Sequence, residues 1–416
     1  MDETMLLDNV FERFLKGSSL FLDRDVLRHD YIPDKLPHRG EQIRYLGEVV
    51  APVLRGSLCS NVFVYGKTGT GKTAVVRYVL DRLSEKAGEL GAPLKTCYIN
   101  CRLAGTEYRV LSSLCNAIGV DVPFTGLAVG EVFDRFRTGL NSAKVLLLPV
   151  LDEIDSLVKT RGDILLYELT RINETLHSGR ISIIGISNDL RFKEFLDPRV
   201  LSSLSEEEMV FRPYDAAELR DILWDRALLA FYERRVLDGA VSLCAALAAA
   251  EHGDARRALD LLRVAAEIAE REGAEAVAED HVRIAEKRIE HDRITEAVRN
   301  LPSHSKLVLC SVYLLSTAKV NVMITGDIYE IYCELCDESG FAPLTQRRVS
   351  SLVNELDVIG LLNARVASMG RYGRTKKIRL GVPRTLVRDA LANDDRLNRL
   401  TGYAPKCLAQ ISRGRR

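Results

Sequence analysis

The sequence predicts three regions in order: an α/β region with a parallel sheet, an all-helical region, and a small C-terminal module of helices and a hairpin. Short apolar strands alternate with helical segments in the first half of the chain, which is typical of a parallel sheet covered on both faces. After about residue 213 the strand signals stop, and residues 215–290 show the apolar spacing of helices. A strand–turn–strand pattern around Gly370–Gly373 follows in the last region. The four expected strands are 61–65, 95–100, 145–151 and 181–187.

The 416 residues are enough for two or three domains. We expect a base at 1–212 with a helical insert near 106–136, a helical domain at 213–297, and a final domain at 298–416 that opens near Asn300–Pro302. No internal repeat or low-complexity segment interrupts this order.

Composition excludes several classes of protein. Lys and Arg number 58 and so do Asp and Glu, so the formal net charge is zero and any nucleic-acid surface must be local. Nine scattered cysteines, an odd number, favour a reducing compartment over a disulfide framework. The chain has neither a signal-peptide pattern nor an apolar run long enough to cross a bilayer. We therefore expect a cytoplasmic protein with no membrane partner.

The segment Gly66–Thr73, GKTGTGKT, fits the phosphate-binding pattern G-x-x-x-x-G-K-[ST] at every position. A strand precedes it and a helix follows it, which is the context that the pattern requires. Glycines let the backbone wrap the phosphates, and the N–H groups at the helix N-terminus face negative charge. We expect Lys72 to reach the β and γ phosphates of ATP, and Thr73 to bind Mg²⁺. The residues expected to contact ATP or ADP are Thr68, Gly69, Thr70, Gly71, Lys72, Thr73 and Ala74.

An acidic pair follows the third apolar strand, in VLLLPVLDEID. We expect Asp152 to hold Mg²⁺ and Glu153 to orient or deprotonate the attacking water. Such a pair about 80 residues after a phosphate loop is a strong signal in an α/β chain. Pro149 is unexpected there, because proline removes a ladder hydrogen bond from a central strand.

The ordered set of motifs resembles the AAA+ superfamily, and within it the archaeal origin-recognition initiators of the Orc/Cdc type. The resemblance spans about residues 10–390 and implies an α/β P-loop AAA+ domain with a parallel sheet, an all-α lid and a C-terminal winged-helix domain. Its motifs are PHRGEQI, GKTGTGKT, INCR, TEYRVL, LDEID, SNDL, DPRVLSSL, FRPY and GDARRALDLL. Gly40 departs from the family pattern, in which Glu directly follows Arg, so the contacts of Arg39 and Glu41 are not carried over.

The resemblance also implies roles for single residues. Asn188 matches sensor 1, which positions the hydrolytic water, and Arg256 matches sensor 2, which reaches the γ-phosphate. Arg199 matches the arginine finger that a neighbouring subunit contributes in trans. The lid-side positions that close over the nucleotide are Tyr214 and Arg226, and the box that flanks the adenine is His38–Ile43.

Residues 341–384 carry nine basic and two acidic side chains, a local excess of nine minus two, or +7. Such a concentration in a neutral chain indicates a polyanionic partner. The sequence predicts a helix capped by Thr345, with an apolar stripe at Val349, Leu352, Val353 and Leu356, and a basic hairpin after it. This is the layout of a winged helix, which places the helix in the major groove. The expected DNA contacts are Thr345, Gln346, Arg347, Arg348, Ser350, Arg371, Arg374, Lys376 and Lys377.

These observations together favour an ATP-dependent replication initiator that binds double-stranded origin DNA. The resemblance implies slow ATP hydrolysis, ATP and ADP acting as a state switch, assembly with other initiator subunits, and recruitment of a replicative helicase. It also implies that the insert reaches the minor groove, with Pro123–Leu127 as the candidate tip. The alternatives are a paralogue that regulates initiation, a branch-migration-type AAA+ motor, and a nucleotide-gated regulator with a DNA-binding tail.

Overall fold

The computed structural model describes residue 11 and residues 20–28, 31–204, 207–320, 322–368, 374–394 and 396–408. The chain divides into two compact units, Met1–Ile284 and Ala285–Arg416, each with its own hydrophobic core. No helix within the described segments is long and apolar enough to cross a membrane.

The described residues of the first unit form a six-stranded sheet in which all the paired strands are parallel. The order is β2-β3-β5-β1-β6, and β4 pairs with β3 beside β5. The strands are β1 (Val62–Gly66), β2 (Leu94–Asn100), β3 (Leu146–Asp152), β4 (Arg180–Ile181), β5 (Ile184–Ser187) and β6 (Glu207–Phe211). The predicted parallel sheet is therefore confirmed.

The structure differs from the expected strands in two places. The expected strand 181–187 is two strands, β4 and β5, because the ladder with β3 is interrupted opposite Pro149. Ser182 N–H still donates to Leu147 O, but the next bond would need a N–H from residue 149, which proline lacks. Pro149 therefore lies at the point where the hydrogen-bond ladder of β3 with β4 and β5 is interrupted. Strand β6 was missed, since this short edge strand buries only alternate residues and carries two glutamates.

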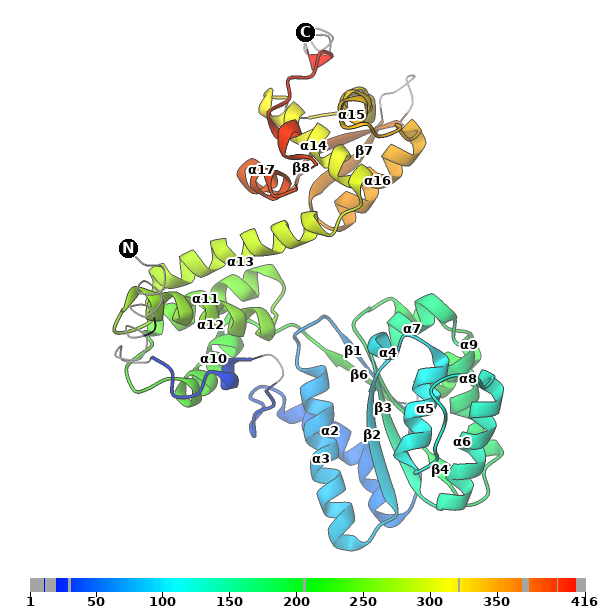
Figure 1. The fold of residues 1–416 in the computed structure, drawn as a ribbon. Helices are drawn as coiled ribbons and strands as arrows, with labels where there is room; N and C mark the ends of the chain where they lie inside the picture. Colours follow the sequence, from blue (N-terminus) through cyan, green and yellow to red (C-terminus); the bar gives the residue numbers. More distant parts are fainter. Residues whose placement is uncertain are drawn as a thin grey trace. The chain divides into compact units, whose positions relative to one another are not determined.

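Helices cover both faces of the sheet (Figure 1). Successive residues of β3 point to opposite sides: Leu148 packs in the core under one set of helices and Leu147 in the core under the other. The first set is α2 (Gly40–Val50) and α3 (Lys72–Leu90). The second set is α4 (Cys101–Ala104), α5 (Glu107–Ala117), α6 (Val129–Ala143), α7 (Ile154–Arg161), α8 (Ile164–Arg171) and α9 (Pro198–Leu204). Helices α5 and α6 lie between β2 and β3, in the region where the insert near 106–136 is predicted.

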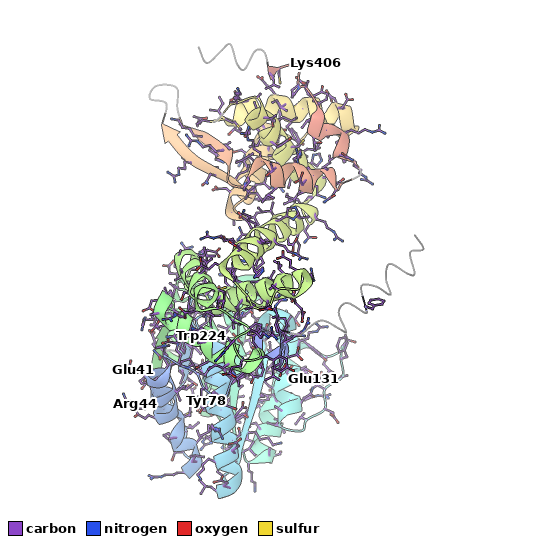
Figure 2. The ribbon with its side chains drawn as sticks, turned by 90° about the vertical axis from the view of Figure 1, so that its left-hand side faces the viewer. Glu41, Arg44, Tyr78, Glu131, Trp224 and Lys406 are labelled. Carbon is purple, nitrogen blue, oxygen red and sulfur yellow. The ribbon has the colours of Figure 1, made fainter. Side chains whose placement is uncertain are left out.

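The rest of the first unit is the helical lid. Helix α10 begins with a capping box in which Asp215 and Glu218 each bond the other's backbone N–H. Trp224, labelled in Figure 2, is the single tryptophan of the chain and lies on this helix. The lid helices are α10 (Ala216–Ala230), α11 (Asp238–Glu251) and α12 (Ala255–Glu272), and α13 (Glu279–Arg299) continues from them into the second unit.

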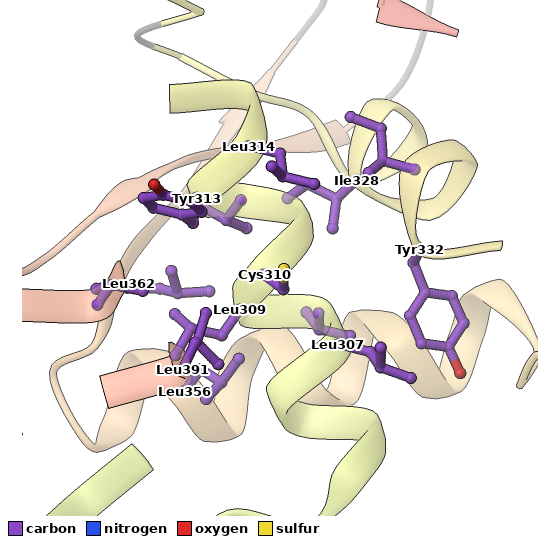
Figure 3. Close-up of a cluster of buried hydrophobic side chains, with 14 of the residues drawn as sticks. Leu307, Leu309, Cys310, Tyr313, Leu314, Ile328, Tyr332, Leu356, Leu362 and Leu391 are labelled. Carbon is purple, nitrogen blue, oxygen red and sulfur yellow. The ribbon is translucent and has the colours of Figure 1, made fainter. Parts of the chain in front are cut away.

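The second unit is a winged helix. Its core, shown in part in Figure 3, packs Leu307 and Cys310 of α14 against Tyr332 of α15, Leu356 of α16 and Leu391 of α17. Strands β7 and β8 form the antiparallel hairpin, and its tip at 369–373 lies outside the described residues. The elements are α14 (Ser303–Thr317), α15 (Thr325–Ser339), α16 (Gln346–Val358), β7 (Leu362–Ser368), β8 (Arg374–Leu380) and α17 (Arg384–Ala392).

Candidate functional site

The phosphate loop joins the end of β1 to the start of α3 at Lys72. Two of its glycines have left-handed backbones, Gly69 at φ +68° and Gly71 at φ +87°. Both are also tightly packed against the lid. A Cβ on Gly69 would lie 1.6 Å from Asp254 Oδ1, and one on Gly71 would lie 2.7 Å from the Tyr214 hydroxyl. Glycine is required at both positions for conformation and for space.

Lys72 is buried inside the loop. Its Nζ donates to Gly66 O at 2.8 Å and to Lys67 O at 2.6 Å. Burial lowers the pKa of Lys72 to about 8, while the nearby carboxylates, led by Asp152, oppose that shift. A buried cation at the N-terminus of a helix is suited to binding phosphate.

Oxygen ligands for a divalent cation meet at Asp152. Its Oδ2 accepts the Thr73 hydroxyl at 2.8 Å and the Tyr98 hydroxyl at 2.6 Å, and its Oδ1 accepts the N–H of Glu153 at 2.8 Å. A hydroxyl and a carboxylate beside a phosphate site are the donor set that Mg²⁺ takes. The expected Mg²⁺ residues, Thr73 and Asp152, are therefore brought together.

Glu153 follows in a left-handed conformation, φ +52°, which is uncommon for a residue other than glycine. Asn100 Nδ2 donates to its Oε1 at 3.4 Å, and Arg102 lies 3.7 Å from its Oε2. Strained backbone conformations of this kind cluster at functional sites, where they fix the direction of a side chain.

A cavity of about 750 Å³ between the sheet and the lid collects most of the expected nucleotide residues. Asn188 lines it from the end of β5, and Arg256 lines it from the start of α12. The next residue, Arg257, turns away and pairs with Glu251 at 3.2 Å. The further expected residues that line this cavity are Gly69, Thr70, Gly71, Lys72, Thr73, Ala74, Asp152, Glu153, Tyr214 and Arg226.

The expected adenine box, His38–Ile43, does not line this cavity. The segment immediately before it, Tyr31–Pro37, does. Arg226 donates to the carbonyls of Val26 and Tyr31 and so holds this segment in place. Glu41, labelled on α2 in Figure 2, is exposed and does not line the cavity.

Arg199 does not line this cavity. It is exposed on α9, pairs with Asp197 at 3.1 Å and lies over the ring of Tyr167. The role of Arg199 at a neighbouring subunit's site stays a prediction.

Tyr98 and Asn100 were missed by sequence reasoning. Both lie on β2, two positions apart, so their side chains emerge on the same face, toward the acidic pair. The only sequence signal is their position at the carboxyl end of a strand in a parallel sheet, where such sites form.

The second candidate site lies on α16 and the hairpin. Thr345 caps α16 by accepting the N–H of Arg348, and the predicted apolar stripe is buried, as expected. Gln346, Arg347 and Arg348 are exposed. Arg348, however, pairs with Glu355 at 3.0 Å.

Two expected contacts on the helix and the hairpin bind each other. Lys376 Nζ donates to Ser350 Oγ at 2.9 Å and to Asn354 Oδ1 at 2.7 Å. Lys377 is exposed on β8. Arg371 lies outside the described residues, and of Arg374 only the backbone, the first residue of β8, is described.

One cavity brings together a phosphate loop at the end of β1, an acidic pair at the end of β3 and a helical lid. This combination defines a nucleotide-binding protein of the AAA+ ATPase type, here with a winged helix. Family models agree region by region: an AAA domain at 55–192, a Cdc6 AAA+ ATPase-type lid domain at 220–287, and a CDC6 C-terminal winged helix domain at 296–390.

The ORC1-type DNA replication protein of Thermococcus onnurineus is 52% identical over 401 residues, covering 95% of this chain and 96% of the relative. The relative of Pyrococcus furiosus with the same description is 52% identical over 392 residues, covering 93% of each chain. The solved structure of Aeropyrum pernix ORC1 in complex with DNA is 51% identical, with a TM-score of 0.83, and covers 92% of this chain and 99% of that one. The chain belongs to the family of ORC1-type DNA replication proteins, which confirms the resemblance and the fold class.

Proposed function

We propose that this protein is an ATP-dependent replication initiator that binds double-stranded origin DNA, with ATP and ADP as the two states of a switch. The observation that carries the proposal is the single cavity in which Lys72, Thr73, Asp152, Glu153 and Arg256 meet beneath the lid. Membership of the ORC1-type family and the DNA complex of the Aeropyrum pernix relative support the DNA-binding part.

Each polar residue of the cavity has a role in this proposal. Lys72 and the loop N–H groups bind the β and γ phosphates. Thr73 and Asp152 hold Mg²⁺, which neutralises phosphate charge when bound. Glu153 accepts a proton from the attacking water, and Asn188 orients that water. Arg256 contacts the γ-phosphate from the lid, so the lid distinguishes ATP from ADP.

Slow turnover follows from the position of Arg199. Because this arginine is exposed and outside its own cavity, a neighbouring initiator subunit must bring its arginine to the site. A lone subunit therefore holds ATP for long periods, which suits a switch better than a fast motor. Recruitment of a replicative helicase is the expected consequence at the origin, in a nucleoid-associated, cytoplasmic location.

The DNA-binding surface consists of the exposed start of α16 and the basic hairpin. Gln346 and Arg347 would contact base edges in the major groove, and Lys377 would contact phosphate. The rest of the chain carries a net negative charge that offsets the positive charge of this module. Electrostatic attraction to DNA is therefore concentrated on this one module.

Chromatin immunoprecipitation followed by sequencing tests the proposal. We expect a few sharp peaks, which become weaker with Arg347→Ala and are unchanged with Arg388→Ala, a change in an exposed arginine of α17. Diffuse binding across the chromosome would contradict the role of an initiator.

A further inference from the structure

Arg39 is the largest of the most fully buried side chains, 1% exposed, and it lies immediately before α2. Arginine keeps its charge in proteins, so its burial is costly unless the charge is compensated. The structure thus places a permanent cation inside the first unit, next to the phosphate loop.

The guanidinium of Arg39 joins three segments. Its Nε donates to Thr70 O in the phosphate loop at 3.1 Å and to the Tyr214 hydroxyl at 3.0 Å. Its Nη2 donates to Arg212 O, just after β6, at 2.9 Å. The guanidinium also lies 3.9 Å from the centre of the Tyr214 ring, a cation–π contact. The phosphate loop, the last strand and the start of the lid therefore meet at one side chain.

This arrangement is not the one that stability alone favours. Within the described part of the chain, no carboxylate forms an ion pair with Arg39, and its buried Nη1 has no hydrogen-bond partner. A buried cation without an acid and an unused donor both cost folding free energy. Such costs are retained where a residue serves function.

The loop and the lid are also in direct contact beside Arg39. The N–H of Ala255, the first residue of α12, donates to Gly69 O at 3.1 Å. Gly71 packs against the hydroxyl of Tyr214. Next to Arg39, His38 Nε2 lies 2.9 Å from Asp221 Oδ2 on α10. A displacement of the loop carbonyls must therefore move, or break away from, the residues that start the lid.

We propose that Arg39 is a positioning residue that couples the conformation of the phosphate loop to the lid. Phosphate bound by the loop fixes the position of Thr70 O. Arg39, which is bonded to that oxygen, in turn fixes Arg212 O and the Tyr214 hydroxyl. Because α10 begins two residues after Tyr214, the start of the helix is fixed as well. The inference rests on the proposed function, since it requires nucleotide in this cavity. It assigns to one residue before α2 the coupling that a state switch needs.

Hydrogen exchange measured by mass spectrometry tests the coupling. Nucleotide should slow exchange in the wild-type protein at residues 67–74 and also in α10. Arg39→Lys keeps the charge but not the planar fork. We expect it to retain protection at 67–74 and to lose most of the nucleotide-dependent protection in α10. Tyr214→Phe, which removes only the hydroxyl, should show the same split more weakly. ATP is used about a hundredfold above the Kd of each variant.

The control is Leu83→Ala, a buried change about three turns along α3 from the loop. It lowers stability without touching Arg39, so it should leave the protection of α10 as in the wild type. Full α10 protection in Arg39→Lys would overturn the inference, and so would a wild-type α10 that does not respond to nucleotide. If the wild-type loop itself shows no protection by ATP, the proposed function fails as well, which separates the two results.

Discussion

The hydroxyl of Tyr98 donates to Oδ2 of Asp152 at 2.6 Å, and the same oxygen accepts the hydroxyl of Thr73 at 2.8 Å. Tyr98 comes from β2, at the edge of the sheet, and Arg77 lies 3.8 Å from the centre of its ring. The carboxylate that is expected to hold Mg²⁺ is thus fixed from the neighbouring strand as well as from the phosphate loop.

Replacing Tyr98 with Phe should weaken the Mg²⁺ site more than the nucleotide site. The ring and its contact with Arg77 remain, but Asp152 loses a donor that orients it. We expect the Mg²⁺ concentration for half-maximal nucleotide binding to rise about tenfold. Titration of Mg²⁺ with a fluorescent ATP analogue measures this. An unchanged Mg²⁺ requirement would remove Tyr98 from the site.

Nucleotide affinity should fall as pH rises through about 8. The pKa of Lys72 in the free protein is lowered to about 8, so above that pH the lysine is neutral and must take up a proton to bind phosphate. Binding isotherms between pH 7 and pH 9 should show about a tenfold loss per unit in the upper part of the range. Lys72→Arg, whose charge persists, should remove this pH dependence.

Raising the pH should have the opposite effect on folding stability: it should lower nucleotide affinity but raise the free energy of unfolding. Between the folded pKa of Lys72, about 8, and its unfolded value of 10.5, the unfolded chain binds the extra proton. The free energy of unfolding of the nucleotide-free protein should therefore rise with pH in that window. Denaturant titrations of wild type and Lys72→Met should converge as pH approaches 10.5. If the free energies of unfolding of the wild type and Lys72→Met differ by the same amount at pH 7 and at high pH, the lowered pKa of Lys72 is contradicted.

Lys72→Ala should abolish nucleotide retention. It removes the cation that binds the phosphates, whereas Lys67→Ala, an exposed change in the same loop, should leave binding intact. The nucleotide content of the purified variants, measured by chromatography, decides the matter. ADP retained by Lys72→Ala would make the site assignment wrong.

Glu153→Gln should keep ATP binding and stop turnover, because the amide has a similar shape but cannot accept a proton. Single-turnover hydrolysis and binding, measured side by side, test this separation. As a control, Glu174→Gln changes a glutamate that does not line the cavity. Persistent hydrolysis would exclude Glu153 from the chemistry.

Arg347→Ala should cost DNA affinity about 1–3 kcal/mol if the side chain reaches a base. Arg348→Ala should cost less, since this arginine is held by Glu355 and must give up that ion pair to contact DNA. Fluorescence anisotropy with origin duplex, at a stated salt concentration, compares the two. Equal binding by the wild type and both variants would place recognition elsewhere on the chain.

Much of the fold and the nucleotide site could be predicted from local sequence. The phosphate loop and the acidic pair are contiguous motifs, and the apolar stripe of α16 repeats with the period of a helix. The resemblance then supplied Asn188 and Arg256, which line the cavity as expected. Strand β6 was missed because its signal is two buried residues among polar ones.

The phosphate loop, the parallel sheet, the helical region and the basic terminal module are predictable from the sequence, because they depend on neighbouring residues and on short periodicities. Which polar side chains meet depends instead on how the whole chain packs. Arg39 and Tyr214 are 175 positions apart, and Arg226 and Val26 are 200 apart. Contacts over such separations follow from how the strands and helices pack, so Arg39, Tyr98 and the pairing of Lys376 with α16 became visible only in three dimensions.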